Sequence, residues 1–369
     1  MGGRRCAVEN LVGMFGGFYS GKTVWVTGHT GFKGAWLSQW LHHLGAHVHG
    51  FALAPHASPN LHETVAPETF LSEIIGDIGN FELVQKTVGS VQPEMVFHLA
   101  AQPLVRRSYE APLETATTNI LGTAHVLEAL RVHQNNCPVV VVTSDKCYEN
   151  NGSDHAFGET DPLGGHDIYS ASKAAAEIMT ASWRRAFHRR IAVARAGNVI
   201  GGGDYGEDRL VPDCIRALCA GSPIAVRNPA ATRPWQHVLD CLSGYLWLGA
   251  RLAKEADLAD AFNFGPRLEA QRPVRELVET LLQHWPGEWT DASDPNAPHE
   301  APTLSLNIDK AATVLGWVPV WDFAEAVQQT ACWYQQRHED ESAAGADLCR
   351  AQLEAYAAAA SAQSCVWAR

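Results

Sequence analysis

Apolar residues in this chain gather into short continuous runs, and these alternate with amphipathic segments from residue 22 to about residue 200. Continuous apolar runs are typical of parallel strands covered on both faces, whereas half-exposed strands alternate in polarity. We therefore predict an α/β fold with a Rossmann-type doubly wound parallel sheet. Strands are expected at residues 23–27, 47–53, 95–100, 139–144 and 191–195, with a short strand ending near Asp77, and helices at residues 32–44, 117–132 and 169–187.

The composition of the chain changes after residue 197, where Gly, Pro and charged residues become frequent. A helix at residues 238–252 and a late strand at 260–265 return to the earlier pattern. We expect a smaller mixed C-terminal lobe for the substrate, beside the sheet domain. The predicted division is a Rossmann domain at 21–197 with 238–265 returning to it, a substrate lobe at 198–237 and 266–337, and terminal extensions at 1–20 and 338–369.

Three glycines follow the first predicted strand, and an amphipathic helix follows them. Gly28, Gly31 and Gly34 lie in the run Gly28-His-Thr-Gly-Phe-Lys-Gly34. Glycines let the backbone turn sharply and approach a pyrophosphate, and the helix N-terminus offers free N–H groups to it. A tight strand-to-helix turn is the structural alternative. The strand–turn–helix context favours dinucleotide binding.

Composition excludes several classes of function. The net charge of −12 gives no basic surface for nucleic acid or for an anionic membrane. Nine scattered cysteines lack CxxC or Cys/His spacing, so we expect no metal site and free thiols in a reducing cytoplasm. The first twenty residues lack a continuous apolar segment, and no apolar run approaches a membrane span.

Tyr169 and Lys173 are four residues apart in a predicted helix. That spacing places both on one face, where the cation is expected to lower the pKa of the phenol. Such a tyrosine can take a proton from a sugar hydroxyl while hydride leaves the same carbon. An ordinary surface pair is the alternative, but the position one helix after the strand at 139–144 favours catalysis.

That strand ends in Ser144, Asp145 and Lys146. Ligands of doubly wound sheets lie at the carboxyl ends of the strands, so a hydroxyl, an acid and a base are available there. Spacing alone does not separate this interpretation from a capping Asp145 and a solvated Lys146.

With these motifs, the chain over residues 20–335 resembles the extended short-chain dehydrogenases/reductases. The resemblance rests on the glycine motif, on His98-Leu-Ala-Ala-Gln102, on Asn119, and on Tyr169 with Lys173. Within that superfamily it resembles the nucleotide-sugar 4,6-dehydratases, most closely the branch acting on CDP-glucose. The specific stretches are Ser144-Asp-Lys-Cys-Tyr-Glu-Asn150 and Gly197-Asn-Val-Ile-Gly-Gly-Gly-Asp204. Relatives acting on dTDP- or GDP-sugars usually have Glu at the position of Lys146.

The resemblance implies a lyase that converts CDP-D-glucose to CDP-4-keto-6-deoxy-D-glucose and water. Hydride moves from C4 to C6 by way of bound NAD. Tyr169 is implied as the base at the 4-hydroxyl, Lys146 as the base at C5 and Asp145 as the acid at the 6-hydroxyl. Ser144 would hold O4, and Lys173 would assist Tyr169. This is mainly a task of positioning.

The same resemblance assigns further contacts. Asn198 and Arg233 would hold the substrate diphosphate, with Arg209 a weaker candidate, since guanidinium groups fork onto phosphate oxygens. Helix capping is the alternative for Asp77, and a surface ion pair for Arg233. Implied cofactor contacts are Gly28, Thr30, Gly31, Phe32, Gly34, Asp77, Ile78, Ala100, Tyr169 and Lys173.

One departure concerns the second strand, which ends without the acid that often binds the adenosine ribose. No basic cluster that could bind the phosphate of NADP takes the place of this acid. The expected cofactor is therefore NAD, with weaker binding of its adenosine ribose.

A homodimer is expected through helices 117–132 and 169–187, with Ala174, Ala175, Ile178 and Met179 on their outer turns. The alternative functions are a nucleotide-sugar 4-epimerase, a 4,6-dehydratase for another nucleotide-glucose, and a nucleotide-sensing scaffold. The Asp145-Lys146 pair argues against the epimerase, which needs no acid and base for C5 and C6. Tyr169 and Lys173 argue against the scaffold, which needs no catalytic pair.

Overall fold

A computed structural model describes residues 11–56, 58–152, 155–294, 304–340 and 343–369. A seven-stranded sheet in the order β12-β7-β5-β4-β1-β2-β3 lies at its centre, and every neighbouring pair is parallel. The order reverses between β1 and β4, which is the point where doubly wound sheets bind dinucleotides. The strands are β1 (Thr23–Thr27), β2 (His47–Ala52), β3 (Leu71–Ile75), β4 (Met95–His98), β5 (Val139–Val142), β7 (Ile191–Ala196) and β12 (Ala261–Phe264).

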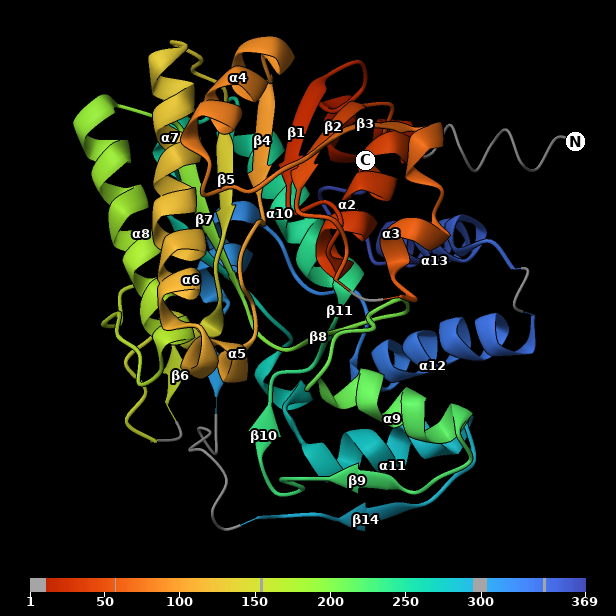
Figure 1. Cartoon of the computed structure of the whole chain (residues 1–369). Coiled ribbons are helices and arrows are strands. Elements are labelled where there is room, and N and C mark those ends of the chain that lie inside the picture. Colours follow the sequence, from red (N-terminus) through yellow and green to blue (C-terminus); the bar gives the residue numbers. More distant parts are fainter. Residues whose placement is uncertain (1–10, 57, 153–154, 295–303, 341–342) are drawn as a thin grey trace, which may run out of the picture.

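Both faces of the sheet are buried, which explains the continuous apolar runs. Val24 and Val26 of β1 join one hydrophobic core, while Trp25 between them joins the other. Helices α4 (Phe81–Val91), α7 (Gly122–Val132) and α8 (Ile168–Phe187) cover one face, whereas α2 (Phe32–His43) and α10 (Val238–Leu252) cover the opposite one (Figure 1). The strand and helix predictions are therefore confirmed, with ends shifted by at most two residues except at the start of the helix predicted at 117–132.

The predicted helix at 117–132 differs from expectation in its first turn. Residues Thr117–Leu121 form a π-helical turn, and the α-helix α7 begins only at Gly122. Asn119 within this turn donates from Nδ2 to Ser172 Oγ at 2.8 Å and accepts from the backbone N–H of Gln102 at 2.8 Å. The turn thus ties α8 to the loop after β4, consistent with the occurrence of π-turns at functional sites.

Most residues of the predicted substrate lobe build small sheets and helices below the main sheet (Figure 1). Strand β8 (Val199–Ile200) pairs in parallel with β11 (Gln236–His237), and β9 (Ile224–Val226) pairs in parallel with β14 (Trp289–Asp291). The pair β10 (Thr232–Arg233) and β13 (Arg272–Pro273) is antiparallel, and β6 (Ala156–Phe157) pairs with β15 (Ser305–Leu306). The remaining helices are α3 (Leu61–Thr64), α5 (Val105–Glu110), α6 (Pro112–Ala116), α9 (Leu210–Cys219), α11 (Val274–His284), α12 (Phe323–Glu339) and α13 (Gly345–Ala362), with a second π-turn at Ala311–Leu315.

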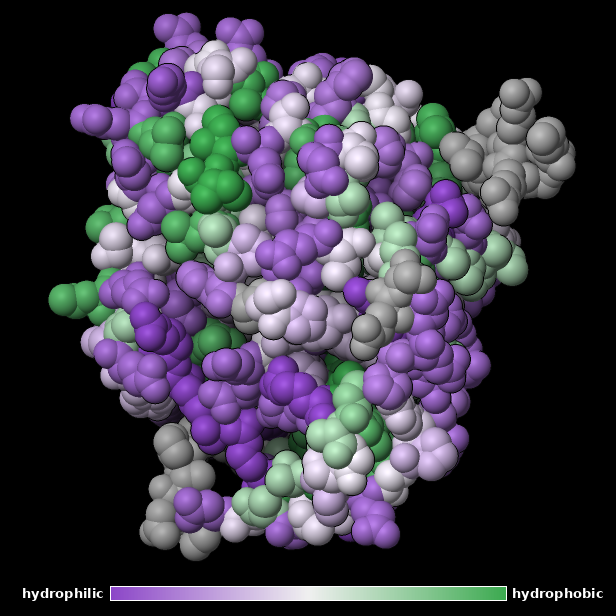
Figure 2. Space-filling view, turned by 45° about the vertical axis from the view of Figure 1, so that its right-hand side comes forward, coloured by the Kyte–Doolittle hydropathy of each residue, from purple (hydrophilic) through white to green (hydrophobic). Residues whose placement is uncertain are grey.

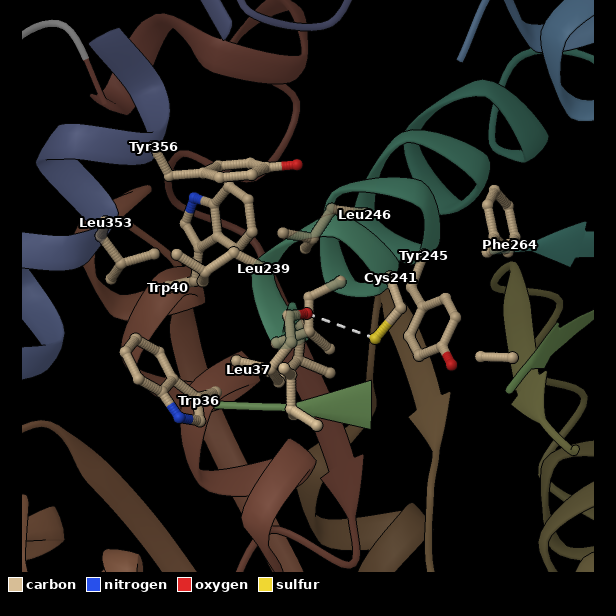
Figure 3. Packing of buried hydrophobic residues seen from close by; sticks show 14 of the residues in the cluster. Trp36, Leu37, Trp40, Leu239, Cys241, Tyr245, Leu246, Phe264, Leu353 and Tyr356 are labelled. Atoms are coloured by element: carbon tan, nitrogen blue, oxygen red, sulfur yellow. Dashed lines mark hydrogen bonds between the residues drawn. The ribbon is translucent and has the colours of Figure 1, made fainter. Parts of the chain in front are cut away.

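The two ends of the described chain pack against each other and against the core. The ring of Trp367 stacks on Phe15 at 5.5 Å between centroids, and the Phe15 N–H donates to the Trp367 carbonyl at 2.7 Å. Helix α13 places Leu353 and Tyr356 beside Trp40 of α2 and Leu239 of α10 (Figure 3). The C-terminal segment therefore adds a layer to one face of the sheet. Residues 1–10 of the predicted N-terminal extension lie outside the described residues.

The face of the molecule in Figure 2 is largely hydrophilic, with small apolar areas between the polar ones. No helix in the described part of the chain has the length and apolar character needed to cross a membrane. The eight cysteines within the described ranges are all free thiols.

Candidate active site

The glycine loop lies at the carboxyl end of β1 and leads into α2. Gly28 has φ +78°, and a Cβ there would lie 2.6 Å from the backbone nitrogen of Ala100 after β4. A Cβ at Gly34 would lie 2.1 Å from the carbonyl oxygen of Gly28. Both positions therefore require glycine, because the loop is folded tightly onto β4 and onto the first turn of α2. This is a cradle at the switch point, with the helix N-terminus open at Gly31.

The other predicted cofactor positions surround this loop. Thr30 donates from its hydroxyl to the Leu53 carbonyl at 2.9 Å, which ties the loop to the end of β2. Ile78 is buried against Gly122, where a Cβ would approach Ile78 Cγ2 to 2.6 Å. Asp77 is exposed after β3 and accepts the Gly79 N–H at 2.7 Å, while Asn80 caps α4. The helix-capping alternative for Asp77 is thus wrong, since another residue performs it.

The structure brings Ser144, Asp145 and Tyr169 together. Strand β5 ends at Val142, and Ser144 caps the short 3-10 turn Asp145–Cys147 by accepting the Lys146 N–H at 3.2 Å. The Ser144 hydroxyl donates to Asp145 Oδ1 at 3.0 Å and also shares a hydrogen bond with Tyr169. Two elements distant in sequence therefore meet at one hydroxyl, which is the arrangement needed to hold a substrate oxygen.

Burial dominates the proton affinities of the tyrosine–lysine pair. It raises the pKa of Tyr169 to about 12, against smaller lowering effects from the Ser144 hydrogen bond and from Arg209. It lowers the pKa of Lys173 to about 8, and the charge of Lys33 lowers it further. Burial thus outweighs the lowering of the Tyr169 pKa that the spacing from Lys173 predicted, and the positive charge of an oxidised nicotinamide, when bound, would act against burial. Burial disfavours the charged form of both groups, so it opposes the expected pairing.

Asp145 is suited to hold a proton. It is buried, and this burial raises the pKa of its carboxyl despite the lowering effects of Lys146, Ser144, Arg233 and Lys33. Its Oδ2 is also buried and has no hydrogen-bond partner among the described residues. A carboxyl group in this state can donate a proton to an oxygen placed beside Oδ2.

Arg209 and Arg233 approach this group from the second part of the chain. Arg209 Nη1 donates to both oxygens of the Asp204 carboxylate at 3.0 Å. The charge of Arg209 also lowers the pKa of Tyr169. Arg233 in β10 donates to the Thr232 carbonyl at 2.9 Å and influences Asp145. Asn198 lies between β7 and β8, and its carbonyl accepts the Gln236 N–H at 3.1 Å. Arg209 is thus placed as firmly at the site as Arg233.

Sequence reasoning did not select Lys33, although it lies inside the quoted glycine motif. Its charge affects both Asp145 and Lys173, so it is part of the electrostatic environment of the site. The feature of the sequence that could have identified Lys33 is its position in the first turn of α2, directly after the helix start at Phe32.

A buried polar network beneath the site was also missed. Glu177, one helical turn after Lys173, accepts from Thr143 Oγ1 at 2.6 Å and from Arg195 Nε at 2.9 Å. Arg195 Nη1 donates to the Tyr148 hydroxyl at 2.6 Å, and that hydroxyl donates to Asn263 Oδ1 at 2.7 Å. These bonds join β5, α8, β7 and β12 around the turn that holds Asp145 and Lys146. One signal for this network was present in the sequence, which is that Glu177 lies four residues after Lys173 and therefore on the same helix face.

The sequence profile of the family described as GDP-mannose 4,6 dehydratase matches residues 25–330. The chain belongs to this family. It is 44% identical over 329 residues to the CDP-glucose 4,6-dehydratase of Salmonella typhimurium, a match covering 86% of this chain and 92% of that protein. It is 30% identical over 325 residues to a dTDP-glucose 4,6-dehydratase of Streptomyces antibioticus, covering 84% and 91% of the two chains.

Solved structures of the dehydratase–epimerase type share the fold. A dTDP-glucose 4,6-dehydratase from Streptomyces venezuelae, solved with NAD bound, has a TM-score of 0.74 at 24% identity over 86% of this chain and 98% of its own. A UDP-glucose 4-epimerase from Thermotoga maritima has a TM-score of 0.75 at 22% identity, over 85% and 98%. Since proteins of both kinds share this fold, the fold alone does not decide between the two reactions.

Proposed function

We propose that this member of the family is an NAD-dependent nucleotide-sugar 4,6-dehydratase that converts CDP-D-glucose to CDP-4-keto-6-deoxy-D-glucose and water. The observation that supports the dehydratase reaction is the buried Asp145 carboxyl, which has a raised pKa, bonds Ser144 through Oδ1 and leaves Oδ2 without a partner among the described residues. A 4-epimerase needs no acid to release a 6-hydroxyl. The choice of CDP-glucose is supported by the 44% identity to a CDP-glucose 4,6-dehydratase.

The glycine cradle fits a dinucleotide. Gly28, Gly31 and Gly34 with the N-terminus of α2 would hold its pyrophosphate, with Thr30, Phe32, Asp77, Ile78 and Ala100 around it and Tyr169 and Lys173 beside its reactive end. NAD, when bound there, supplies the hydride acceptor and donor for the sugar.

The chain's own residues perform the proton transfers. Ser144 holds O4, and Tyr169 removes the proton of the 4-hydroxyl. The resulting 4-ketone makes the C5 proton acidic, so that Lys146 can remove it. Asp145 then transfers its proton to the departing 6-hydroxyl, which leaves as water. Asn198, Arg233 and Arg209 bind the diphosphate and fix the sugar relative to these groups.

An assay for the 4-keto sugar in base tests this function, with CDP-, dTDP-, GDP- and UDP-glucose as substrates. We expect the signal with CDP-glucose at the highest kcat/KM. Formation of a 4-epimer without a 4-keto product would contradict the dehydratase proposal. A higher kcat/KM with another nucleotide would contradict only the base assignment.

Cofactor retention is predicted to be incomplete after purification. Strand β2 ends at Ala52 and is followed by Leu53 and Ala54, so no carboxylate is placed there to bind the ribose hydroxyls. Activity should rise when NAD is added to purified protein, and NADP should have little effect. Protein that purifies with one tightly held NAD per chain would contradict this argument.

A homodimer through α7 and α8 is also predicted. Val132 of α7 and Ile178 and Phe187 of α8 are exposed. Leu121 of the preceding π-turn and Leu113 of α6 are exposed as well, and apolar helix faces of this kind are suited to a four-helix interface. Ala174 was expected on the outer turns, but it is buried within the chain against residues such as Phe157. Light scattering at micromolar concentration should give twice the chain mass, and a monomer would contradict the prediction.

A further inference from the structure

Two histidines and one glutamate from separate elements meet on the α3 side of β2 and β3. His29 belongs to the glycine loop, His62 to α3 and Glu73 to β3. We call these three residues the histidine–glutamate cluster. The three residues do not form one of the short spacing motifs by which metal ligands are recognised in a sequence.

The three side chains converge on one point. His29 Nε2 lies 2.7 Å from Glu73 Oε2, and His62 Nε2 lies 3.1 Å from the same oxygen. The candidate ligand atoms of all three residues lie within 4.8 Å of one another. In a tetrahedral zinc site, bond lengths of about 2.0–2.2 Å place neighbouring ligand atoms about 3.3 Å apart. Movements of less than about 1 Å therefore suffice to admit an ion.

The surroundings hold the imidazole rings in place. The ring of His29 is fully buried and meets the ring of His62 edge-on at 5.1 Å between centroids. Gly50 of β2 makes room for it, because a Cβ at Gly50 would lie 2.5 Å from His29 Cγ. Rigid ligands cost little entropy when a metal binds. Glu73 keeps 34% of its side chain exposed, so the cluster borders solvent on this side.

The protonation states suit a metal. Burial is the main cause that lowers the pKa of His29 and that of His62 below 6.5, although Glu73 acts in the opposite direction on both. Metal ligation requires the neutral form of an imidazole, and burial acts in that direction on both residues. Two neutral imidazoles and a carboxylate are the donor set that zinc takes in sites with an open position.

We propose that His29, His62 and Glu73 bind one divalent transition-metal ion, with Zn²⁺ as the ion that the ligand set matches best. The site is separate from Tyr169 and Asp145, which lie beyond the opposite side of β1 in the sheet order. Its ion would link the glycine loop to α3 and β3.

The test uses the full-length protein treated with a chelator and then dialysed. Titration calorimetry with ZnCl₂ should show one site per chain, and Co²⁺ should give visible absorption bands typical of four- or five-coordinate imidazole ligation. Glu73→Gln should weaken binding by at least about 10-fold, because the loss of even an outer-shell partner typically costs about 10–100-fold. This substitution preserves the size of the side chain and its ability to hydrogen-bond neutral imidazoles, so the fold is maintained. His62→Asn should weaken binding to a similar extent.

His47→Asn is the matched control, because His47 is exposed at the start of β2 and takes no part in the cluster. It should retain the wild-type affinity, and Zn²⁺ should raise the melting temperature of wild type and of His47→Asn but not that of Glu73→Gln. Wild-type affinity in Glu73→Gln, or an absence of stoichiometric binding by the wild type, would overturn the proposal. The cluster would then be only a hydrogen-bonded triad.

Discussion

Lys146→Ala is expected to lower the rate of 4-keto-6-deoxy product formation by about 10²–10⁴-fold, the usual contribution of a positioned general base. Lys146 follows Asp145 in the turn that β5 presents to the site, and its charge influences the Asp145 carboxyl. Without the amine, oxidation at C4 should still occur because Ser144 and Tyr169 remain. The C5 proton would stay in place, so the reaction should stall before water is lost.

Exchange at C5 distinguishes this loss from a general defect. In deuterated buffer the variant should incorporate deuterium at C5 much more slowly than the wild type, while reduced nicotinamide accumulates. Lys254→Ala is the control, since Lys254 is exposed after α10 and far along the chain from the site. If Lys146→Ala exchanged C5 as fast as the wild type, another group would be the base, and Lys146 would be a partly exposed lysine without a catalytic role.

Tyr169→Phe is expected to abolish the first oxidation. The substitution keeps the buried ring but removes the hydroxyl that shares a hydrogen bond with Ser144, so no group accepts the 4-hydroxyl proton. We expect a loss of about 10²–10⁴-fold in the rate of C4 oxidation, with little change in the melting temperature.

Rapid-mixing absorbance should show no reduced nicotinamide when Tyr169→Phe meets substrate. Tyr109→Phe is the control, because Tyr109 is 53% exposed on α5. Reduced nicotinamide at the wild-type rate would show that Tyr169 is not the base. The same experiment separates the two variants: Lys146→Ala should form reduced nicotinamide and Tyr169→Phe should not.

The local pattern of apolar residues was sufficient to predict most strands of the sheet and the helices that cover it. Val139–Val142 is apolar at every position, and both faces of β5 are buried, so the run could be interpreted without knowledge of its neighbours. The glycine spacing was equally informative, because the steric demand at Gly28 and Gly34 arises within a short strand–turn–helix unit. The order Ser144-Asp-Lys and the spacing of Tyr169 from Lys173 likewise placed candidate chemistry at the ends of β5 and α8.

The tertiary structure decided what depends on contacts between distant segments. Burial sets the proton affinities of Tyr169 and Asp145, and burial is a property of the packed chain rather than of neighbours in sequence. The Glu177–Arg195 pair and the histidine–glutamate cluster each join residues from separate strands and helices. Ala174 faces inward because of the lobe that packs on it.

The fold class, the glycine loop and the pairing of Tyr169 with Lys173 could be predicted from the chain's own pattern, because backbone sterics and periodicity act within about twenty residues, before the chain is packed. The roles proposed for Ser144, Asp145 and Lys146 came instead from the resemblance to a family, since spacing alone left them open. Tertiary structure alone decided which of these groups are dehydrated, which oxygen of Asp145 is left to carry a proton, and how the ends of the chain close over α2 and α10. Those outcomes depend on segments that meet only after folding, and no local pattern encodes the distance between them.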